Sequence, residues 1–575
     1  MKVKLAKTAG FCMGVRRAME IILFEANRGD GKLFTYGPLI HNRQVLDLLR
    51  SKGVDVKKDI DEHDKGRIII RAHGITPAER EILRSSSLKI IDATCPRVAK
   101  VQAIIKTHSN KGYAPVIFGD ARHPEVIGLM GYSKGHGIVI NSIEDMERLP
   151  DNKRLVVVSQ TTQDVDAYRK IVNAIKGRYP DAIIFDTICD ETYKRQREVK
   201  SLASEVDSMV IVGGYDSGNT RRMYQISRST GKPTFHVETD KELEGLWFSS
   251  TETVGVTAGA STPNWMIKSV TERLKAMGKR RHPLVSLLRK VFQFLIKMNI
   301  PVATGAFFLT YAGLILSKGS ADFIHPFLTM LYVYSMHVLN RYLDKGASTY
   351  NDPGIAFFYT QHKVFLITTS LIGIGTGLIL SIYLGIAQFL LFLALTILGI
   401  IYSIPIIPLR FQYLGRYAKI KDLPGSKTMA ESLAWGTISS LLPIIGWPSP
   451  FWPGVLISFL FVSSMCYIRS GLFDILNIQG DLIVGRETLP IALGEERTLK
   501  LLLLLNSLFA AIILLSTGIG IVSNLGYPLI SCFLISVFYL EAYHKRWMRG
   551  GSPLKAIAET NLLLAGLLAL IWKVF

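Results

Sequence analysis

Residues 182–199, AIIFDTICDETYKRQREV, place Cys189 between a short apolar run and a basic amphipathic stretch. The apolar run predicts a strand, and the periodicity after the cysteine predicts a helix. The same order of features recurs in VKLAKTAGFCMGVRRAMEII (3–22), which carries Cys12, and in LKIIDATCPRVAKVQAII (88–105), which carries Cys95. We therefore expect three related α/β lobes, each with a cysteine at a strand-to-helix turn.

A cysteine at such a turn lies near a helix N-terminus, where the helix dipole favours the thiolate. The three cysteines are 83 and 94 residues apart, so they lack the closely spaced pairs and the fourth ligand of a structural zinc site. Three converging thiolates suit a 4Fe–4S cluster that keeps one iron open to substrate. The alternative is three inert buried cysteines, which the repeated setting disfavours.

Three histidines also follow apolar strands, each at a loop position near Gly or Pro. They are His41 in GPLIHN, His73 in RAHGITPAE and His123 in DARHPEVIG. We expect them to converge on an anion. Glu125, two residues beyond His123, is the acid of its loop, and a partly desolvated carboxyl there would hold and deliver a proton.

Two loops rich in small residues are suited to phosphate oxygens. GGYDSGNTRR (213–222) and GVTAGASTPNW (255–265) each follow an apolar strand and offer hydroxyls, amides and backbone N–H groups. Each loop alone is a weak signal.

Together these motifs resemble the LytB (IspH) family of 4-hydroxy-3-methylbut-2-enyl diphosphate reductases. The resemblance covers residues 1–278 and rests on GFCMGVRRA, GPLIHN, RAHG, DATCP, HPEV, SQTT, TIC…RQ, SGNT and GVTAGASTP. It implies reductive dehydroxylation of the allylic alcohol diphosphate to isopentenyl and dimethylallyl diphosphate at a 4Fe–4S cluster. It also implies an external electron donor such as ferredoxin or flavodoxin.

The family's functional residues map onto this sequence one by one. The cluster ligands would be Cys12, Cys95 and Cys189; the diphosphate would be bound by His41, His73, His123, Ser217, Asn219 and Ser261; the proton relay would be Glu125 with Thr161. Gly218 is a departure, because many members have serine there. A backbone N–H at Gly218 can still face a phosphate, so we expect a weakened contact at most.

The charge of the chain changes near residue 280. The first 280 residues hold 45 Lys+Arg and 34 Asp+Glu, which leaves 22 and 12 for the remaining 295 residues. The charged fraction falls from about 28% to about 12%, too little to cover a soluble surface. This pattern excludes a single soluble enzyme, a disordered chain and a disulfide scaffold. The start, MKVKLAKTAG, reads as a strand rather than a signal peptide, so we expect the first part in a reducing cytoplasm.

Uncharged runs in the second part predict nine transmembrane helices. They lie at 298–317, 323–340, 364–409, 432–468, 501–540 and about 556–572, and the three longest each have room for two helices. The expected fold is therefore a three-lobed α/β iron–sulfur reductase domain (1–278), a basic juxtamembrane linker (279–290) and an all-α nine-helix transmembrane bundle (291–575).

Basic residues gather in alternate loops of this topology, which places those loops and the N-terminal part in the cytoplasm. The expected location is the inner (cytoplasmic) membrane, multi-pass, with the basic linker against anionic membrane lipid. The net charge of +21 is explained by this topology, and no nucleic-acid partner is expected.

Two polar clusters lie at the expected cytoplasmic ends of the helices. Asn340 and Asp344 share one helical face, and so do Asp474, Asn477 and Asp481. Facing carboxylates of this kind can hold Mg²⁺ that bridges to a diphosphate, with Arg410 and Arg486 for the remaining phosphate charge. The alternative is ordinary solvation of helix ends by acids.

The motifs NRYLD, YSIPIIPLR and DILNIQGDLIVGRETLP, in residues 291–575, resemble the UbiA family of intramembrane prenyltransferases. In that family two aspartate-rich motifs carry Mg²⁺ and a prenyl diphosphate, and a cavity between helices accepts an aromatic or polar acceptor. This sequence departs at Arg341, Ser348 and Asn477, where the family usually has aspartate or another acid.

The leading hypothesis is a reductase fused to a prenyltransferase. A second hypothesis keeps the reductase and makes the membrane part a non-catalytic anchor. A third makes the N-terminal part an iron–sulfur redox sensor of the membrane part, although a sensor would need neither Glu125 nor the three loop histidines.

Overall fold

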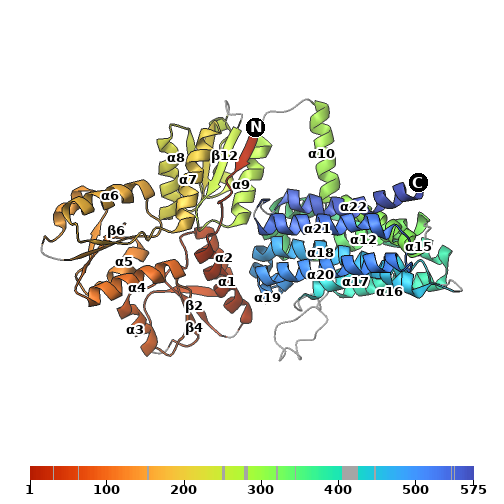
Figure 1. The fold of residues 1–575 in the computed structure, drawn as a ribbon, viewed down its shortest axis with the longest axis horizontal. Coiled ribbons are helices and arrows are strands. Elements are labelled where there is room, and N and C mark those ends of the chain that lie inside the picture. The colour runs from red at the N-terminus through yellow and green to blue at the C-terminus, as the bar shows by residue number, and fades with distance from the viewer. Residues whose placement is uncertain are drawn as a thin grey trace. The chain divides into compact units, whose positions relative to one another are not determined.

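The computed structural model comprises two compact units, Met1–Lys279 and Arg280–Phe575 (Figure 1). The description covers the whole chain except residues 30, 62–63, 152–153, 249–252, 278–282, 319–321, 344, 404–424, 446–448, 546, 549–550 and 575. Asp344 and most of the YSIPIIPLR motif, which the sequence analysis singled out, therefore lie outside the described residues. Each unit is considered by itself.

The first unit contains three sheets of four parallel strands, which confirms the prediction of three α/β lobes. The strand orders are β1-β12-β10-β11, β3-β2-β4-β5 and β7-β6-β8-β9. In the first sheet the strands are β1 (Lys2–Leu5), β10 (Ser208–Val212), β11 (Thr234–Val237) and β12 (Thr253–Ala258). The second has β2 (Leu33–Tyr36), β3 (Val54–Lys57), β4 (Arg67–Ile70) and β5 (Lys89–Asp92). The third has β6 (Ala114–Phe118), β7 (Ile138–Ile140), β8 (Leu155–Ser159) and β9 (Ile183–Ile184).

Helices connect these strands, as parallel pairing requires. They are α1 (Met13–Arg28), α2 (Arg43–Ser51), α3 (Pro77–Ser85), α4 (Pro96–Asn110), α5 (Pro124–Met130), α6 (Val165–Arg178), α7 (Asp190–Ser204), α8 (Gly218–Ser229) and α9 (Asn264–Met277), with short 3₁₀ turns η1 (Glu144–Arg148), η2 (Asp240–Glu242) and η3 (Gly245–Phe248).

The central strands are apolar on both faces because helices cover the sheets. All four residues of β4 are buried, and so are all five of β8 and β10. In the second sheet Tyr36, Ile70 and Asp92 lie side by side at the carboxyl ends of β2, β4 and β5. Parallel pairing thus brings the loops that follow these strands to one edge, which is where ligands bind in open α/β sheets.

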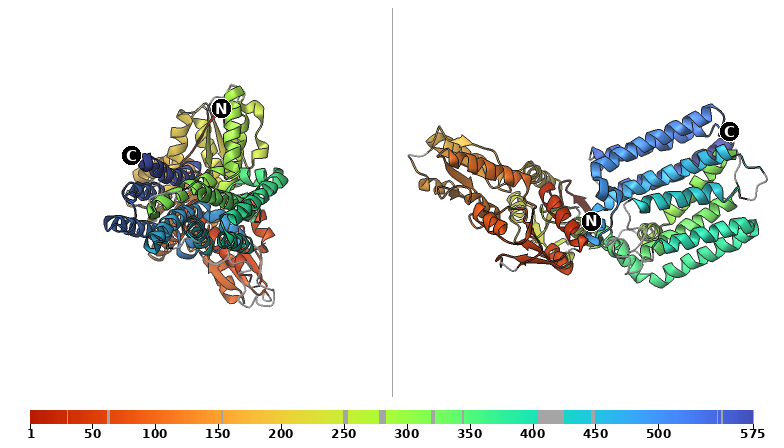
Figure 2. Two further views of the ribbon diagram at one scale, coloured as in Figure 1. Left: turned by 90° about the vertical axis from the view of Figure 1, so that its right-hand side faces the viewer. Right: turned by 90° about the horizontal axis from the view of Figure 1, so that it is seen from below.

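The second unit is a bundle of helices that lie side by side (Figure 2). They are α10 (Pro283–Lys297), α11 (Ile300–Lys318), α12 (Ile324–Leu343), α13 (Lys345–Asn351), α14 (Pro353–Gln361), α15 (Lys363–Leu384), α16 (Ile386–Ile401), α17 (Ser426–Gly436), the π-helical turn η6 (Thr437–Leu441), α18 (Trp452–Val484), α19 (Leu489–Leu493), α20 (Glu495–Gly518), α21 (Gly526–His544) and α22 (Ser552–Val574). Part of the predicted linker therefore forms the start of α10.

The predicted count of nine membrane spans is not confirmed. Within the described part of the chain, six helices are long and apolar enough to cross a membrane: α11, α15, α18, α20, α21 and α22. The other three predicted spans fall on α12, α16 and α17 with η6. Helix α16 has 16 residues and α17 has 11, while α12 carries polar side chains that lower its hydropathy. Uncharged runs identified helices correctly but did not guarantee the length or the apolarity of a span.

Glycines bring some of these helices close together. A Cβ on Gly305 of α11 would lie 3.1 Å from Leu562 of α22, and a Cβ on Gly313 would lie 2.8 Å from the Ser458 hydroxyl of α18. Small residues at such crossings are typical of helices that pack within a membrane. Around them Tyr311, Phe461 and other fully buried side chains form the largest apolar core of the unit.

Candidate functional site

Each of the three N-terminal cysteines caps the start of a helix. Cys12 precedes α1, Cys95 precedes α4 and Cys189 precedes α7. All three are free thiols and partly buried. The position predicted for each, between a strand and a helix, is therefore the one observed.

The backbone of each cysteine is tied to a neighbouring loop. The amide of Cys12 donates to the carbonyl of Ala260 at 3.1 Å, that of Cys95 to Ala72 at 2.9 Å, and that of Cys189 to Thr161 at 3.0 Å. Ala260 and Ala72 directly precede Ser261 and His73. The cysteines and the candidate substrate loops thus form one connected framework.

Arg195, on α7, strengthens this framework. Its guanidinium is buried and donates to the carbonyl of Gly10 at 2.7 Å and to that of Ala258 at 3.0 Å. The helix that begins at Cys189 therefore fixes the loop before Cys12 and the loop after β12. Arg195 was quoted in the TIC…RQ motif, but sequence reasoning gave it no role.

The cysteine thiols lie close enough to one another for the charge of one to affect the next. Burial raises the pKa of Cys95 and of Cys189, and charge on Cys12 raises both further. Backbone N–H groups of the following helix turns act in the opposite direction. The backbone N–H groups at the helix N-termini thus favour the thiolate, as expected. Burial nevertheless raises the pKa of the thiols by more than these groups lower it when no metal neutralises the charge.

The first turn of α1 packs closely against Cys95. Gly14, in the first turn of α1, lies so close that a Cβ there would sit 2.5 Å from the Cys95 sulfur. Only glycine, which has no side chain, lets α1 approach Cys95 this closely. Three free thiols on three helix N-termini are a donor set that fits a cluster held by three cysteines.

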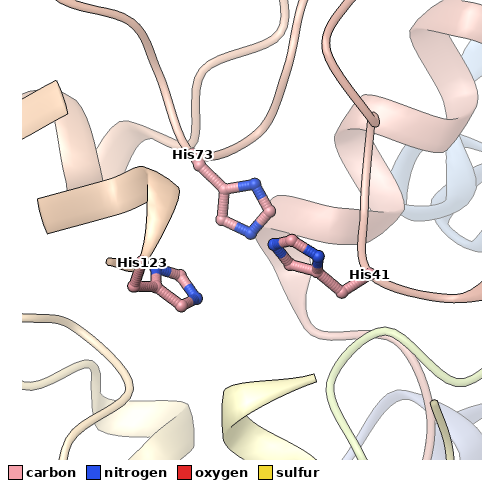
Figure 3. A group of neighbouring side chains, drawn as sticks. All are labelled: His41, His73 and His123. Carbon is pink, nitrogen blue, oxygen red and sulfur yellow. The ribbon is translucent and has the colours of Figure 1, made fainter. Parts of the chain in front are cut away.

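The three loop histidines converge, as Figure 3 shows. The ring centroids of His41 and His73 are 4.8 Å apart, those of His73 and His123 5.4 Å, and those of His41 and His123 5.6 Å. Their nearest ring nitrogens all lie within 4.8 Å of one another. Burial lowers the pKa of all three, that of His73 well below its usual value and that of His123 to about 4. They are therefore neutral at pH 7.

The hydrogen bonds of His123 decide what the group can bind. Nδ1 of His123 accepts from the backbone N–H of Glu125 at 3.2 Å, so the neutral ring carries its proton on Nε2. An N–H donates to an anion and has no lone pair for a metal ion. Nε2 of His41 and Nδ1 of His73 are buried without a hydrogen-bond partner among the described residues. Unpartnered buried nitrogens around one space point to an absent polar ligand.

The phosphate-type loops reach the same space. Ser217 caps α8, and its hydroxyl lies 3.3 Å from that of Ser261, which also donates to the carbonyl of His41 at 3.3 Å. Nδ2 of Asn219, in the first turn of α8, is buried and lacks a partner in the described structure. A Cβ on Gly218 would lie 3.6 Å from the ring of His123. The sequence-predicted residues of four loops thus come together.

Glu125 lies in the first turn of α5 and is 2% exposed. Its carboxylate accepts from the backbone N–H of Thr161 at 2.7 Å and from the Thr161 hydroxyl at 2.9 Å. Burial raises the pKa of Glu125 to about 7 in spite of these two hydrogen bonds. The group is therefore able to hold and to release a proton near neutral pH.

In the membrane unit, a lysine pairs with one of the two aspartates of the acidic motif. Asp474 and Asp481 lie on α18 and are 1% and 2% exposed. Asp474 accepts from Lys427 at 2.9 Å and from the Thr428 hydroxyl at 2.5 Å. Oδ1 of Asp481 accepts from Asn351 at 3.3 Å, whereas its buried Oδ2 has no hydrogen-bond partner in the described part of the chain.

The remaining described residues of the two motifs lie on α12, on α18 and just after α18. Asn477 is on α18 between the two aspartates, and Asn340, on α12, accepts from Ser403 at 2.9 Å. Nη1 of Arg486 is 3.7 Å from Asp481. Lys427 was counted only as a loop charge in the sequence, because nothing local indicates that it pairs with an aspartate 47 residues away.

Fold and site together define a two-part protein. Its first part is an α/β domain with a group of three neighbouring histidines and three cysteines at helix N-termini, and its second part is a helical membrane domain.

Comparisons with known proteins agree with that division. The LytB protein family matches residues 3–275, and the UbiA prenyltransferase family matches residues 300–565. The 4-hydroxy-3-methylbut-2-enyl diphosphate reductase of Geobacter sulfurreducens is 44% identical over 281 residues, which are 49% of this chain and 99% of that protein.

Solved structures are similar to each part. The E-1-hydroxy-2-methyl-but-2-enyl-4-diphosphate reductase of Plasmodium falciparum is 26% identical, with a TM-score of 0.46 over 51% of this chain and 98% of its own. A UbiA homolog from Archaeoglobus fulgidus, bound to DMAPP and Mg²⁺, is 19% identical, with a TM-score of 0.34 over 48% of this chain and 98% of its own.

The chain therefore belongs to the LytB family through its N-terminal half, to which a UbiA prenyltransferase family domain is fused.

Proposed function

We propose that the N-terminal half converts 4-hydroxy-3-methylbut-2-enyl diphosphate to isopentenyl and dimethylallyl diphosphate. The observation that supports this most directly is a buried, protonatable Glu125 beside a group of neutral histidines with unpartnered nitrogens. The 44% identity to a reductase of that name, over nearly its whole length, supports the same activity.

The diphosphate is held by donors from five loops. His41, His73 and His123 donate through ring N–H groups, and Ser217, Asn219 and Ser261 donate through hydroxyl and amide groups. Because these donors are positioned before the substrate arrives, the non-reacting diphosphate fixes the hydroxyl end of the substrate in the site.

Glu125 delivers the proton that turns the leaving hydroxyl into water. Thr161 holds the carboxyl in position through two hydrogen bonds. The overall reaction takes up two electrons and two protons, breaks one C–O bond and releases one water. The second proton goes to the allylic carbon skeleton.

A 4Fe–4S cluster held by Cys12, Cys95 and Cys189 supplies the two electrons and a Lewis-acidic iron when it is bound. An external protein of the ferredoxin or flavodoxin class delivers the electrons. The reductase domain comprises residues 1–278 and lies in the cytoplasm, and residues 279–290 lead into a multi-pass domain, 291–575, of the inner membrane.

The test is an anaerobic assay of the full chain with the alcohol diphosphate and a reduced viologen. We expect both C5 diphosphates as products, and loss of activity in each Cys→Ser variant of the three cysteines. Cys466→Ser is the matched control, because Cys466 is a buried cysteine of the membrane unit. Turnover that survives in all three site variants would refute the assignment.

For the membrane half we propose transfer of a prenyl group from a prenyl diphosphate. Asp481 has a buried oxygen with no hydrogen-bond partner among the described residues, which fits Mg²⁺, and Asp474, Asn477, Asn340 and Asp344 complete the proposed set. Lys427, which pairs with Asp474, is placed to take part of the diphosphate charge. Mg²⁺ when bound neutralises the diphosphate as it leaves.

Membranes that contain the chain should release diphosphate from geranyl diphosphate only with Mg²⁺, and Asp481→Asn should abolish the release. Reductase activity should be unchanged in that variant. A membrane half that neither binds nor cleaves a prenyl diphosphate would instead be the non-catalytic anchor.

A further inference from the structure

The membrane unit holds a second group of charged side chains, which no motif includes. We call it the charge network, of which Arg469 is buried and the other three side chains are partly buried: His337 on α12, Glu431 on α17, Arg469 on α18 and Glu559 on α22. Oε1 of Glu431 lies 3.3 Å from Nε2 of His337 and 3.5 Å from Nη1 of Arg469. Nη2 of Arg469 lies 3.4 Å from Glu559. One arginine thus links two carboxylates and a histidine from four helices.

Such a group is costly inside a membrane protein. Arg469 is 3% exposed, and the alternative for any of these positions is an apolar side chain that needs no partner. Ionisable residues within membrane-spanning helices usually serve substrate or proton pathways. Buried ion pairs also add little net stability compared with apolar packing, so stabilisation alone does not account for the network.

The position of the network along the helices can be compared with that of the diphosphate motifs. His337 lies three positions before the motif residue Asn340, Arg469 lies five positions before the motif residue Asp474, and Glu431 lies four positions after Lys427, which pairs with Asp474. At 1.5 Å per residue, the network lies about 5–8 Å deeper than the motifs. The carbon of a prenyl diphosphate that reacts, C1, is bonded to the diphosphate itself. The network is therefore next to the place where an acceptor must approach C1.

The network has hydrogen-bonding groups for which the described residues provide no partner. Nε of Arg469 is buried without a hydrogen bond among the described residues. Oε1 of Glu431 makes both contacts to the network, and no hydrogen bond or ion pair of its Oε2 is found within the described chain. A ligand that carries both a donor and an acceptor, as a hydroxyl group does, would form the missing hydrogen bonds of these two atoms.

We propose that Glu431 is the catalytic base of prenyl transfer and that the acceptor is a neutral alcohol or phenol. The proposal rests on prenyl transfer as the function of the membrane half. The acceptor's oxygen, or an activated ring carbon beside it, forms a bond to C1. The C1–O bond breaks, and its electron pair leaves with the diphosphate. The hydroxyl proton goes to Glu431, whose negative charge Arg469 balances before the transfer.

The charges of the network favour an acceptor that is itself uncharged. Two carboxylates share one arginine, and Lys427, the nearest other cation on α17, is paired with Asp474. Arg469 and Lys427 already have carboxylate partners, so neither is left for a carboxylate on the acceptor, whereas a neutral hydroxyl would meet an acceptor and a donor. His337 and Arg469 are positioning residues that hold the Glu431 carboxylate.

The experiment uses the full chain in lipid nanodiscs with geranyl diphosphate and Mg²⁺. Diphosphate release without an acceptor and formation of prenylated product are measured separately. The acceptor probes are hydroquinone, which is neutral, and 4-hydroxybenzoate, which is anionic. The variants are Glu431→Gln, Glu431→Asp and, as matched control, Glu541→Gln, which alters a carboxylate of α21 that pairs with Lys545 at 3.5 Å.

We expect Glu431→Gln to lower product formation from hydroquinone by about 100-fold or more and to leave acceptor-free diphosphate release within about twofold. Glu431→Asp should restore part of the transfer, and the control should match the wild type. Equal loss of release and transfer would mean a structural role, and unchanged transfer would refute the base; either result overturns the proposal. Preference of the wild type for 4-hydroxybenzoate overturns the acceptor class. A wild type that binds no geranyl diphosphate and releases none refutes prenyl transfer itself.

Discussion

At the scale of single residues, Glu125 is the proposed proton donor of the reductase half. Its pKa is raised from the usual 4.5 to about 7 because burial outweighs the two hydrogen bonds from Thr161. The protonated form is therefore the donor, and it is lost as the pH rises through about 7. We expect kcat/KM to be constant at lower pH and to fall about tenfold per pH unit above that value.

The variant Glu125→Gln should lower the turnover by about 10²–10⁴-fold and remove the dependence on pH above 7. Viologen oxidation by the full chain measures both effects, and the visible absorbance of the cluster should be unchanged. A Gln variant that keeps the falling limb would show that another group titrates there.

The histidines act on binding rather than on proton delivery. His41→Asn removes an N–H donor from the anion site, so we expect KM for the alcohol diphosphate to rise by about 10–100-fold, as loss of a hydrogen bond to a charged group predicts. His108→Asn is the control, because His108 bonds the carbonyl of Ile104 within its own helix. Equal effects of the two substitutions would contradict the proposed site.

Much of the reductase site is readable from single residues in the sequence. Cysteines, histidines and small-residue loops each follow a strand, and parallel pairing brings the ends of strands together. His337, Glu431 and Arg469 could not be found this way. Each is a lone polar residue in or beside an apolar run, and the partners lie on different helices up to 222 residues apart.

At the scale of elements, the start of α1 is packed against the start of α4 without space for a side chain. Gly14→Ala would place a Cβ 2.5 Å from the Cys95 sulfur. We expect the iron content after anaerobic purification to fall by about half or more, since the sulfur or the helix must shift. Gly177→Ala in α6 is the matched control, because a Cβ there meets no atom within 4 Å. Full cluster occupancy in Gly14→Ala would refute this view of the site.

Element boundaries also show the limits of composition. Uncharged runs located the membrane helices, yet α12 has polar residues near both of its ends, and these residues face the inside of the bundle. Asn299, just before α11, adopts a left-handed backbone (φ 62°), and its side chain bonds Arg341 and Tyr359. Such tertiary contacts decide where a helix stops, and they are invisible in a local window of sequence.

At the scale of the whole molecule, two compact units share one chain. The first has three sheets and its own apolar cores, so it should fold without the second. We expect a fragment of residues 1–279 to remain in the soluble fraction and to keep its cluster, while the full chain sediments with membranes. An insoluble fragment, or a full chain that stays soluble, would contradict the division.

The fusion places two isoprenoid activities in one protein. The division at residue 280, seen first as a drop in charge, coincides with the boundary of the compact units and lies between the two family matches. The products of the first half belong to the same chemical class as the diphosphates that the second half is proposed to cleave.

The central claim is tested most directly by product analysis of the full chain reconstituted with iron and sulfide in lipid vesicles. With limiting reduced viologen and excess 4-hydroxy-3-methylbut-2-enyl diphosphate, we expect one molecule of isopentenyl or dimethylallyl diphosphate for every two electrons consumed. A protein that holds a full cluster and consumes no electrons in the presence of this substrate would contradict the account.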